Sequence, residues 1–141
     1  MSLRYQQFKN IPLSSIFFDS LRNDYIGFDA WFNKKSDQYA FVSYDKSLDI
    51  DGFLYLKIEN ETIEDTEPKL PQKRRIKLGT FKIDAHDTKM GQRFIRKIID
   101  FAIFHNVDEI YVTIFDKHKS LINLLENCGY LCHVACRKNY W

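Results

Sequence analysis

The sequence predicts an α/β fold whose sheet contains an antiparallel hairpin and a βαβ unit. Two apolar segments with strand character, 38–44 and 53–59, flank a polar stretch that ends in Asp-Gly, and this order is typical of a hairpin. A helical pattern over 89–105 follows a strand pattern over 75–84 and precedes a β-branched segment, 109–115. A strand, a helix and a second strand in this order form a βαβ unit.

The composition is that of one globular domain. The chain has 141 residues, of which 45% are hydrophobic and 28% are charged, so we expect a single domain over 1–141. The net charge of +2 gives no general argument for nucleic-acid binding. No apolar run approaches the roughly 20 residues that cross a bilayer, and the N-terminus lacks the apolar segment of a signal peptide. These features predict a cytoplasmic protein without membrane contact.

Three cysteines, Cys128, Cys132 and Cys136, lie close together near the end of the chain. An odd number of cysteines without a secretion signal indicates a reducing compartment. The pattern around the second and third is that of a strand, and no fourth ligand has suitable spacing. We therefore expect buried or half-buried thiols and no metal site.

The first forty residues carry helical patterns rich in aromatic side chains. Ser14 and Ser15 are suited to cap a helix that begins at Ile16. Gly27 is expected to interrupt it, so that a second short helix spans 29–34. The aromatic side chains are expected to pack in the core, and the alternative is that some line a substrate or acyl pocket. They are Phe17, Phe18, Tyr25, Phe28, Trp31 and Phe32.

The stretch 60–73 begins with acidic residues, contains two prolines and ends with a basic residue, which predicts a long hairpin loop. A basic run, 73–75, joins it to the next strand pattern. Such a run is expected to be solvated surface, and contact with a phosphate is the alternative. Gly79, in the middle of the following strand, indicates a bulge or the close approach of a ligand.

The turn before the helix 89–105 is a place where an anion can bind. The first N–H groups of a helix have no partner within it and lie at the positive end of its dipole, so a phosphate can accept their hydrogen bonds. The expected donors are Met90, Gly91, Gln92 and Arg93, and Lys89 and Arg93 add positive charge. The alternative is an ordinary capped surface helix. The predicted buried face comprises Met90, Phe94, Ile95, Ile98, Ile99, Ala102 and Ile103.

The last third of the chain predicts the strand 109–115, a helix over 120–128 and a final strand over 130–140. His118 follows the first of these strands, at an end where α/β proteins place ligands. A histidine there is suited to contact a ligand or to act as an acid or base, and a surface histidine is the alternative. No closing strand follows 130–140. We therefore expect either a fragment of a longer protein or a partner chain, as in a homodimer, that completes the sheet.

Two stretches resemble the motifs of a known family. The first, 86–91 (HDTKMG), lies where the GNAT superfamily of acetyl-coenzyme A-dependent N-acetyltransferases carries Q/R-x-x-G-x-G/A. Gly91 fits the last position, whereas Lys89 replaces the first glycine and His86 replaces Gln or Arg. The second, 118–130, resembles the helix that ends in Leu-Tyr-Glu-Lys-x-Gly-Phe in that superfamily.

Gly129–Tyr130 fits the end of this second motif, and Leu125 replaces its tyrosine, which often protonates the departing thiolate. The resemblance covers most of the chain. It implies a mixed, mostly antiparallel central sheet flanked by helices, with a βαβ coenzyme-binding core and a missing last strand.

The resemblance also implies acetyl-coenzyme A as a co-substrate. Its pyrophosphate would lie at the first turn of the helix, and its pantetheine arm would pair with the preceding strand. A main-chain N–H of Ile83 or a neighbour would stabilise the oxyanion. His118 stands where an asparagine usually contacts the coenzyme. The coenzyme-binding residues expected on this basis are Phe81, Ile83, His86, Lys89, Met90, Gly91, Gln92, Arg93 and His118.

Catalysis further needs a base that takes a proton from the incoming amine. Asp84, His86 and Glu59 are candidates because each lies near a predicted strand end, and a water chain is the alternative. His118 is a candidate acid or base.

We therefore expect an enzyme that moves an acetyl group from acetyl-coenzyme A to an amine by direct attack. The amine is a small molecule, a protein or an RNA. The alternative is a catalytically weak or inactive coenzyme-binding or regulatory module of a larger protein, associated with nucleic acid through basic side chains. These are Lys73, Arg74, Arg75 and Lys77.

Overall fold

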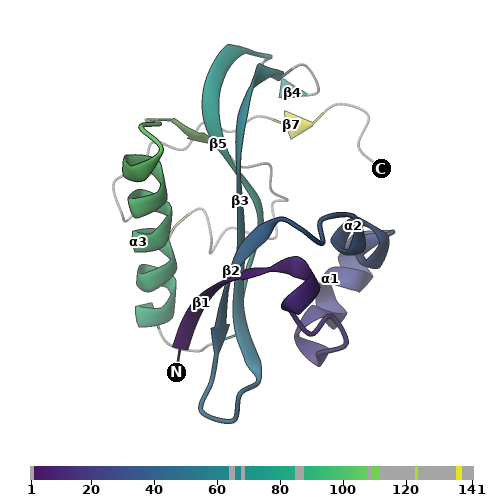
Figure 1. The fold of residues 1–141 in the computed structure, drawn as a ribbon. Coiled ribbons are helices and arrows are strands. Elements are labelled where there is room, and N and C mark those ends of the chain that lie inside the picture. Colours follow the sequence, from purple (N-terminus) through teal and green to yellow (C-terminus); the bar gives the residue numbers. More distant parts are fainter. Residues whose placement is uncertain are drawn as a thin grey trace. The chain divides into compact units, whose positions relative to one another are not determined.

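The computed structural model describes residues 2–63, 66–67, 69–84, 88–107, 109–111, 123 and 136–137. Five strands form one sheet in the order β1-β2-β3-β5-β6, and β4 pairs with β7 (Figure 1). β1–β2 and β2–β3 are antiparallel, whereas β5–β6 is parallel. The predicted α/β fold with a mostly antiparallel sheet is therefore confirmed. In chain order the described elements are β1 (Ser2–Gln7), η1 (Phe8–Asn10), η2 (Ile16–Phe18), α1 (Asp19–Asp24), α2 (Phe28–Lys34), β2 (Tyr39–Tyr44), β3 (Ile50–Ile63), β4 (Thr66–Glu67), β5 (Leu70–Ile83), α3 (Thr88–Phe104), β6 (Ile110–Tyr111) and β7 (Cys136–Arg137).

The chain forms two compact units, and the strands β3 and β5 contribute residues to both. The first unit comprises Met1–Tyr55 and Thr80–His86, and the second comprises Leu56–Gly79 and Asp87–Trp141. Among the helices in the described ranges, none has the length and apolar character needed to cross a membrane.

The sequence pattern does not predict β1. Its residues are mostly polar, yet it pairs with β2 from Ser2–Tyr44 to Gln7–Tyr39. Tyr5 stacks on Tyr39 with ring centroids 5.0 Å apart, and cross-strand aromatic contacts of this kind stabilise a strand without an apolar repeat. The strand was missed because these contacts depend on pairing and not on periodicity.

The predicted β2–β3 hairpin is confirmed, but its turn is shorter than the polar stretch 45–52 that the sequence indicates, and Asp51 and Gly52 lie in β3. β3 already begins at Ile50, and the turn occupies 45–49. The Oδ1 atom of Asp45 accepts hydrogen bonds from the N–H groups two and four residues later, at 2.8 and 3.0 Å. The side chain of Asp45 therefore closes the turn.

The long loop predicted over 60–73 is mostly strand. β3 continues to Ile63 and β5 begins at Leu70, so the two strands form a long ribbon (Figure 1). Main-chain pairing does not require apolar side chains where the faces of a ribbon are exposed, and polar residues are tolerated there. The Gln72 side chain also donates to the carbonyl oxygen of Asn60 at 3.5 Å.

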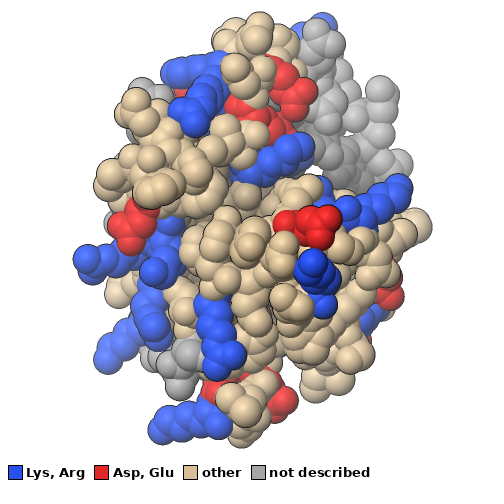
Figure 2. Space-filling view, viewed as in Figure 1, with Lys and Arg blue, Asp and Glu red and all other residues tan. Residues whose placement is uncertain are grey.

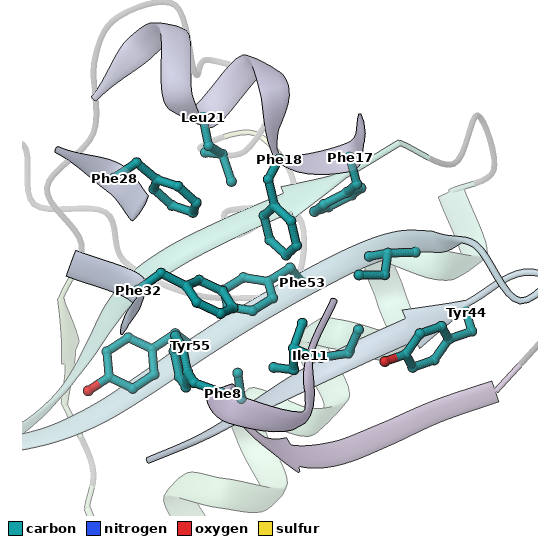
Figure 3. Packing of buried hydrophobic residues seen from close by; sticks show 13 residues of the cluster. Phe8, Ile11, Phe17, Phe18, Leu21, Phe28, Phe32, Tyr44, Phe53 and Tyr55 are labelled. Carbon is teal, nitrogen blue, oxygen red and sulfur yellow. The ribbon is translucent and has the colours of Figure 1, made fainter. Parts of the chain in front are cut away.

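The core of the first unit is an aromatic cluster between helical segments and strands (Figure 3). The side chains of Phe18, Phe32 and Phe53 point toward one another from η2, α2 and β3, and each is at most 2% exposed. The predicted core role of the N-terminal aromatic residues is confirmed, because those not buried outright pack against this cluster. Its members are Phe8, Ile11, Phe17, Phe18, Leu21, Phe28, Phe32, Ala40, Val42, Tyr44, Ile50, Phe53 and Tyr55, with Leu13, Tyr25 and Trp31 packed against it.

The helical segments of this unit begin and end where the sequence predicts. The Ser15 Oγ atom accepts a hydrogen bond from the N–H of Phe17 at 3.2 Å and caps η2. Gly27 has a φ of 79°, in the left-handed region that glycine tolerates best, and it separates α1 from α2. The helix predicted from Ile16 is therefore a 3-10 turn followed by α1.

In the second unit, α3 buries a narrower face than the sequence predicts. Met90, Phe94, Ile95 and Ile98 are buried, as expected. Ile99 and Ile103 were expected in the core, but the structure leaves them 37% and 73% exposed. The apolar face of this helix of 17 residues is longer than the surface against which it packs, so its last apolar side chains are exposed.

The end of α3 is fixed by Asn106, which has a φ of 55°. The N–H of Val107 bonds to the carbonyl of Ala102 at 2.9 Å, and that of Asn106 bonds to Ile103 at 3.2 Å. These two bonds form a Schellman motif, which closes a helix with a left-handed residue.

The last predicted elements fall largely outside the described residues. Asn123 is helical, in keeping with the helix predicted over 120–128. Cys136–Arg137 is a strand, but it pairs antiparallel with Thr66–Glu67 in a two-stranded sheet.

Candidate functional site

The end of β5 carries three of the residues predicted for coenzyme contact and catalysis. Phe81 and Ile83 are half-buried, and the Asp84 carboxylate is 50% exposed. The N–H of Asp84 donates to the carbonyl oxygen of Asp51 at 2.9 Å, which ties this end to the start of β3.

The alternation of the main-chain N–H groups along β5 is interrupted before the end of the strand at Ile83. The N–H of Ile76 bonds to the Glu109 carbonyl beside β6, whereas that of Asp84 bonds to Asp51 in β3, on the other side of β5. N–H groups an even number of residues apart point the same way in a regular strand, so β5 contains an irregularity between these positions. Gly79, where the sequence indicates a bulge, lies between these two positions. Since neighbouring N–H groups in a strand point to opposite sides, the N–H of Ile83 points away from β3.

Two orphaned polar atoms lie beside the hydrogen bond between Asp84 and Asp51. The pairing of β2 with β3 shifts between Ser43–Gly52 and Tyr44–Ile50, so Asp51 is the extra residue of a bulge. Its Oδ1 atom and the Ser43 Oγ atom are buried without a hydrogen-bond partner among the described residues. Such atoms need a donor or acceptor from water or a ligand. This pair was not predicted from the sequence, because Asp51 was attributed to the turn.

Lys82 is a further residue that the sequence does not single out. Its side chain is 19% exposed, and its Nζ atom lies 3.6 Å from the Asp84 Oδ1 atom. The same atom donates to the Phe17 carbonyl oxygen and lies 4.3 Å from the centroid of the Phe17 ring.

The first turn of α3, in the second unit, has the features of an anion site. The helix begins at Thr88, one residue earlier than predicted, so its first N–H groups, those of 88–90, have no partner within the helix. This turn holds no acidic side chain. Lys89 and Arg93 are exposed, whereas Gly91 is buried. Figure 2 shows Lys and Arg side chains gathered on the side of the molecule where Figure 1 places α3.

Glu59, a candidate base, is held in a cluster of polar groups. Its side chain is 9% exposed, accepts a hydrogen bond from the Tyr111 hydroxyl, and lies 3.5 Å from Lys57 Nζ and 4.0 Å from Lys77 Nζ. Burial raises the pKa of Glu59, but the Tyr111 hydrogen bond and the two lysine charges together hold the pKa below its usual value. A carboxylate held in this way is a weaker proton acceptor than an unpaired one.

The basic run 73–75 is exposed at Lys73 and Arg74, as the sequence predicts, but Arg75 is buried. Arg75 is 2% exposed and contacts Glu109 at 2.6 Å, and Lys73 contacts the same carboxylate at 2.7 Å. Arg74 donates to the carbonyl oxygen of His105 at 2.7 Å. With Lys77 beside Glu59, the four basic side chains considered for nucleic acid all have internal partners.

His86 and His118 lie outside the described residues. The predicted coenzyme and acid–base roles of these two histidines remain predictions.

No protein-family model and no curated protein matches the chain. Solved structures match it over nearly its full length. A probable acetyltransferase is 12% identical, with 95% of this chain and 92% of that chain covered and a TM-score of 0.69. An aminoglycoside acetyltransferase from an uncultured soil metagenomic sample is 13% identical, with 99% and 94% covered and a TM-score of 0.69.

A ribosomal-protein-alanine N-acetyltransferase from Brucella melitensis biovar Abortus 2308 is 10% identical, with 95% of this chain and 98% of that chain covered and a TM-score of 0.64. The chain therefore has the fold of GNAT acetyltransferases. The resemblance predicted from the two motifs is confirmed at the level of the fold.

Proposed function

We propose that the protein is a divergent GNAT-type N-acyltransferase, which moves an acetyl group from acetyl-coenzyme A to an amine. The observation that carries the proposal is the acetyltransferase fold, which the three structures above match over 95–99% of the chain. We further propose that 1–141 acts as one domain in the cytoplasm, with a homodimer or another chain completing its sheet.

The first turn of α3 is suited to the coenzyme pyrophosphate. The N–H groups of 88–90 would donate hydrogen bonds to it, and Lys89 and Arg93 would add charge. The lack of an acidic side chain in this turn fits an anion. In this proposal Met90 contributes its main-chain N–H, and Gln92, which is exposed, contributes its side chain.

The end of β5 is suited to the thioester. The Asp84 N–H is already bonded to Asp51, so the oxyanion donor is assigned to the preceding residue, Ile83. Because the Ile83 N–H points away from β3, it is also suited to pair with the pantetheine arm in the manner of an added strand.

The reaction needs two proton transfers. The amine must lose a proton before or as its nitrogen attacks the thioester carbonyl carbon, and we assign this proton to Asp84, whose carboxylate is 50% exposed. Glu59 is the weaker candidate because its carboxylate is already paired. The carbon–sulfur bond then breaks, and the departing thiolate takes up a proton, for which His118 is the candidate donor.

The neighbouring structures do not favour one class of amine. One is named for aminoglycosides, which are small molecules, and another for the alanine of a ribosomal protein. A panel for this protein therefore includes small amines, peptides and RNA.

Isothermal titration with acetyl-coenzyme A tests the proposal. We expect binding in the micromolar range, and Arg93→Ala should weaken it about tenfold because a charge-assisted hydrogen bond is lost. Arg96→Ala is the matched control, since Arg96 is exposed on the same helix beyond its first turn, and it should change the affinity less than about twofold. The absence of micromolar binding by the wild-type protein would refute the proposal.

A coenzyme-binding module without turnover is the second candidate. The pairing of Glu59 with Tyr111 and two lysines favours it, because one candidate base is occupied. Binding of acetyl-coenzyme A without acetylation of any amine in the panel would select this function.

A further inference from the structure

Lys82 is a charged side chain held in a mostly enclosed position at the end of β5. It lies between Phe81 and Ile83, the residues predicted to contact the coenzyme, and its side chain is 19% exposed. An ammonium group in such a place loses hydration and needs compensating partners.

The Nζ atom of Lys82 has three partners, all within the first unit. It donates a hydrogen bond to the carbonyl oxygen of Phe17, lies 4.3 Å from the centroid of the Phe17 ring, and lies 3.6 Å from the Oδ1 atom of Asp84. A carbonyl dipole, a ring face and a carboxylate each attract an ammonium group. Lys82 is therefore suited to be a fixed cation.

The segment that Lys82 holds is itself well determined. Ser15 caps the turn through the N–H of Phe17, and the Phe17 side chain is 2% exposed. Phe18, the next residue, is fully buried and has ring contacts with Phe28, Phe32 and Phe53. One hydrogen bond to the Phe17 carbonyl thus joins η2 to the end of β5.

The other partner, Asp84, is held at two points. Its main-chain N–H bonds to Asp51, and its carboxylate faces Lys82. Because this carboxylate is 50% exposed, its side chain has few other contacts that restrict its rotamer. The ammonium of Lys82 supplies the restriction.

We propose that Lys82 is a positioning residue for acyl transfer. It anchors the segment Ser15–Phe18 on the end of β5 and orients the Asp84 carboxylate beside the proposed thioester site. This inference rests on the proposed function, since the consequence for catalysis presupposes an acyl transfer at this end of the strand. A small displacement of a group that must meet a reacting atom can cost on the order of a hundredfold in rate.

Three variants of the full chain test the inference. Lys82→Met keeps the length of the side chain and removes its charge, and Lys82→Arg restores a cation with hydrogen-bond donors. Lys46→Met, in the exposed turn between β2 and β3, is the matched control for the loss of one lysine. Each variant is compared with the wild-type protein in acetyl-coenzyme A affinity, in kcat and KM for an accepted amine, and in hydrogen exchange of 15–24.

We expect Lys82→Met to lower kcat by about tenfold to a hundredfold. Its affinity for acetyl-coenzyme A should stay within about threefold of the wild-type value, because Lys82 does not lie at the first turn of α3. Exchange of 15–24 should become faster. Lys82→Arg should recover part of kcat, which a loss of stability alone does not predict.

A Lys82→Met variant with the kcat of the Lys46→Met control overturns the inference and leaves the proposed function intact. A wild-type protein that binds no acetyl-coenzyme A refutes the proposed function and, with it, the role in catalysis. In that case the exchange measurement still decides the anchoring, since unchanged exchange of 15–24 in Lys82→Met contradicts it.

Discussion

The ion pair between Arg75 and Glu109 allows a prediction in which the two partners of one contact differ in their effect. The side chain of Arg75 is 2% exposed, whereas that of Glu109 is 36% exposed. Glu109 also has a second cation, Lys73, at 2.7 Å, while the other partner of Arg75 among the described residues is the Glu61 carbonyl at 3.5 Å. Loss of either partner therefore leaves a different group behind.

Glu109→Gln leaves a buried guanidinium without its counter-charge, which costs about 3 kcal/mol at the lower end of the range for a stranded buried charge. Arg75→Met removes the buried charge itself and leaves Glu109 beside Lys73 and solvent. Its expected cost is about 1 kcal/mol, because an apolar side chain of similar length is suited to a buried site. Lys73→Met should cost less than about 1 kcal/mol, since Lys73 is 49% exposed.

Urea unfolding followed by circular dichroism measures these differences. With an m-value of about 2 kcal/mol per molar, the midpoint of Glu109→Gln should lie about 1 M below that of Arg75→Met. The m-values of the variants must agree for the comparison to hold. If Arg75→Met is at least as destabilised as Glu109→Gln, the reasoning from burial and second partners is wrong.

Three further predictions concern stability. The pKa of Glu59 is lowered in the folded protein, so the contribution of Glu59 to stability is complete above the ordinary carboxyl pKa and is lost as the pH falls through the lowered pKa. Glu59→Gln should therefore remove this part of the acid sensitivity, which is measured as the free energy of unfolding from pH 3 to pH 7. A pH profile that is unchanged in Glu59→Gln contradicts the prediction. Phe18→Ala should lower the free energy of unfolding by about 3–5 kcal/mol because the ring is fully buried. Ile26→Ala should change it by less than about 0.5 kcal/mol because the side chain is fully exposed. Equal thermal midpoints for the two variants refute this prediction. Gly27→Ala should cost about 1 kcal/mol from its left-handed backbone alone, because no atom lies within 4 Å of the added methyl group, and Gly27→Asn should cost less; a stabilised Gly27→Ala variant contradicts the prediction.

The helical boundaries were predictable because their signals are local. Ser15 caps the segment that follows it, and Gly27 is placed in a left-handed conformation that few other residues adopt. The hairpin was predictable as well, but the turn predicted over 45–52 includes Asp51 and Gly52, which lie in β3, whereas Asp45 closes the turn. Both stretches have turn-forming residues, and only pairing with β2 decides which of them lies in the strand.

The candidate site was predictable in part. The first turn of α3 was located from the change between strand and helix periodicity, which the chain carries locally. Lys82 and Asp51 were missed, because the Phe17 carbonyl that Lys82 contacts and the Asp84 N–H that bonds to the Asp51 carbonyl lie far from them in the sequence. No pattern along the chain encodes such contacts.

By itself, the sequence determined the α/β class, the βαβ unit and the resemblance to GNAT acetyltransferases, since periodicity, capping residues and short motifs are properties of neighbouring residues. Only the tertiary structure decided which charged side chains are buried and which partners they have. Arg75 was expected in solvent and is buried against Glu109, and Glu59 was expected as a free base and is paired with Tyr111 and two lysines. The reason is that burial and ion pairing depend on which strands become neighbours in the sheet, and that choice is made only when the whole chain folds.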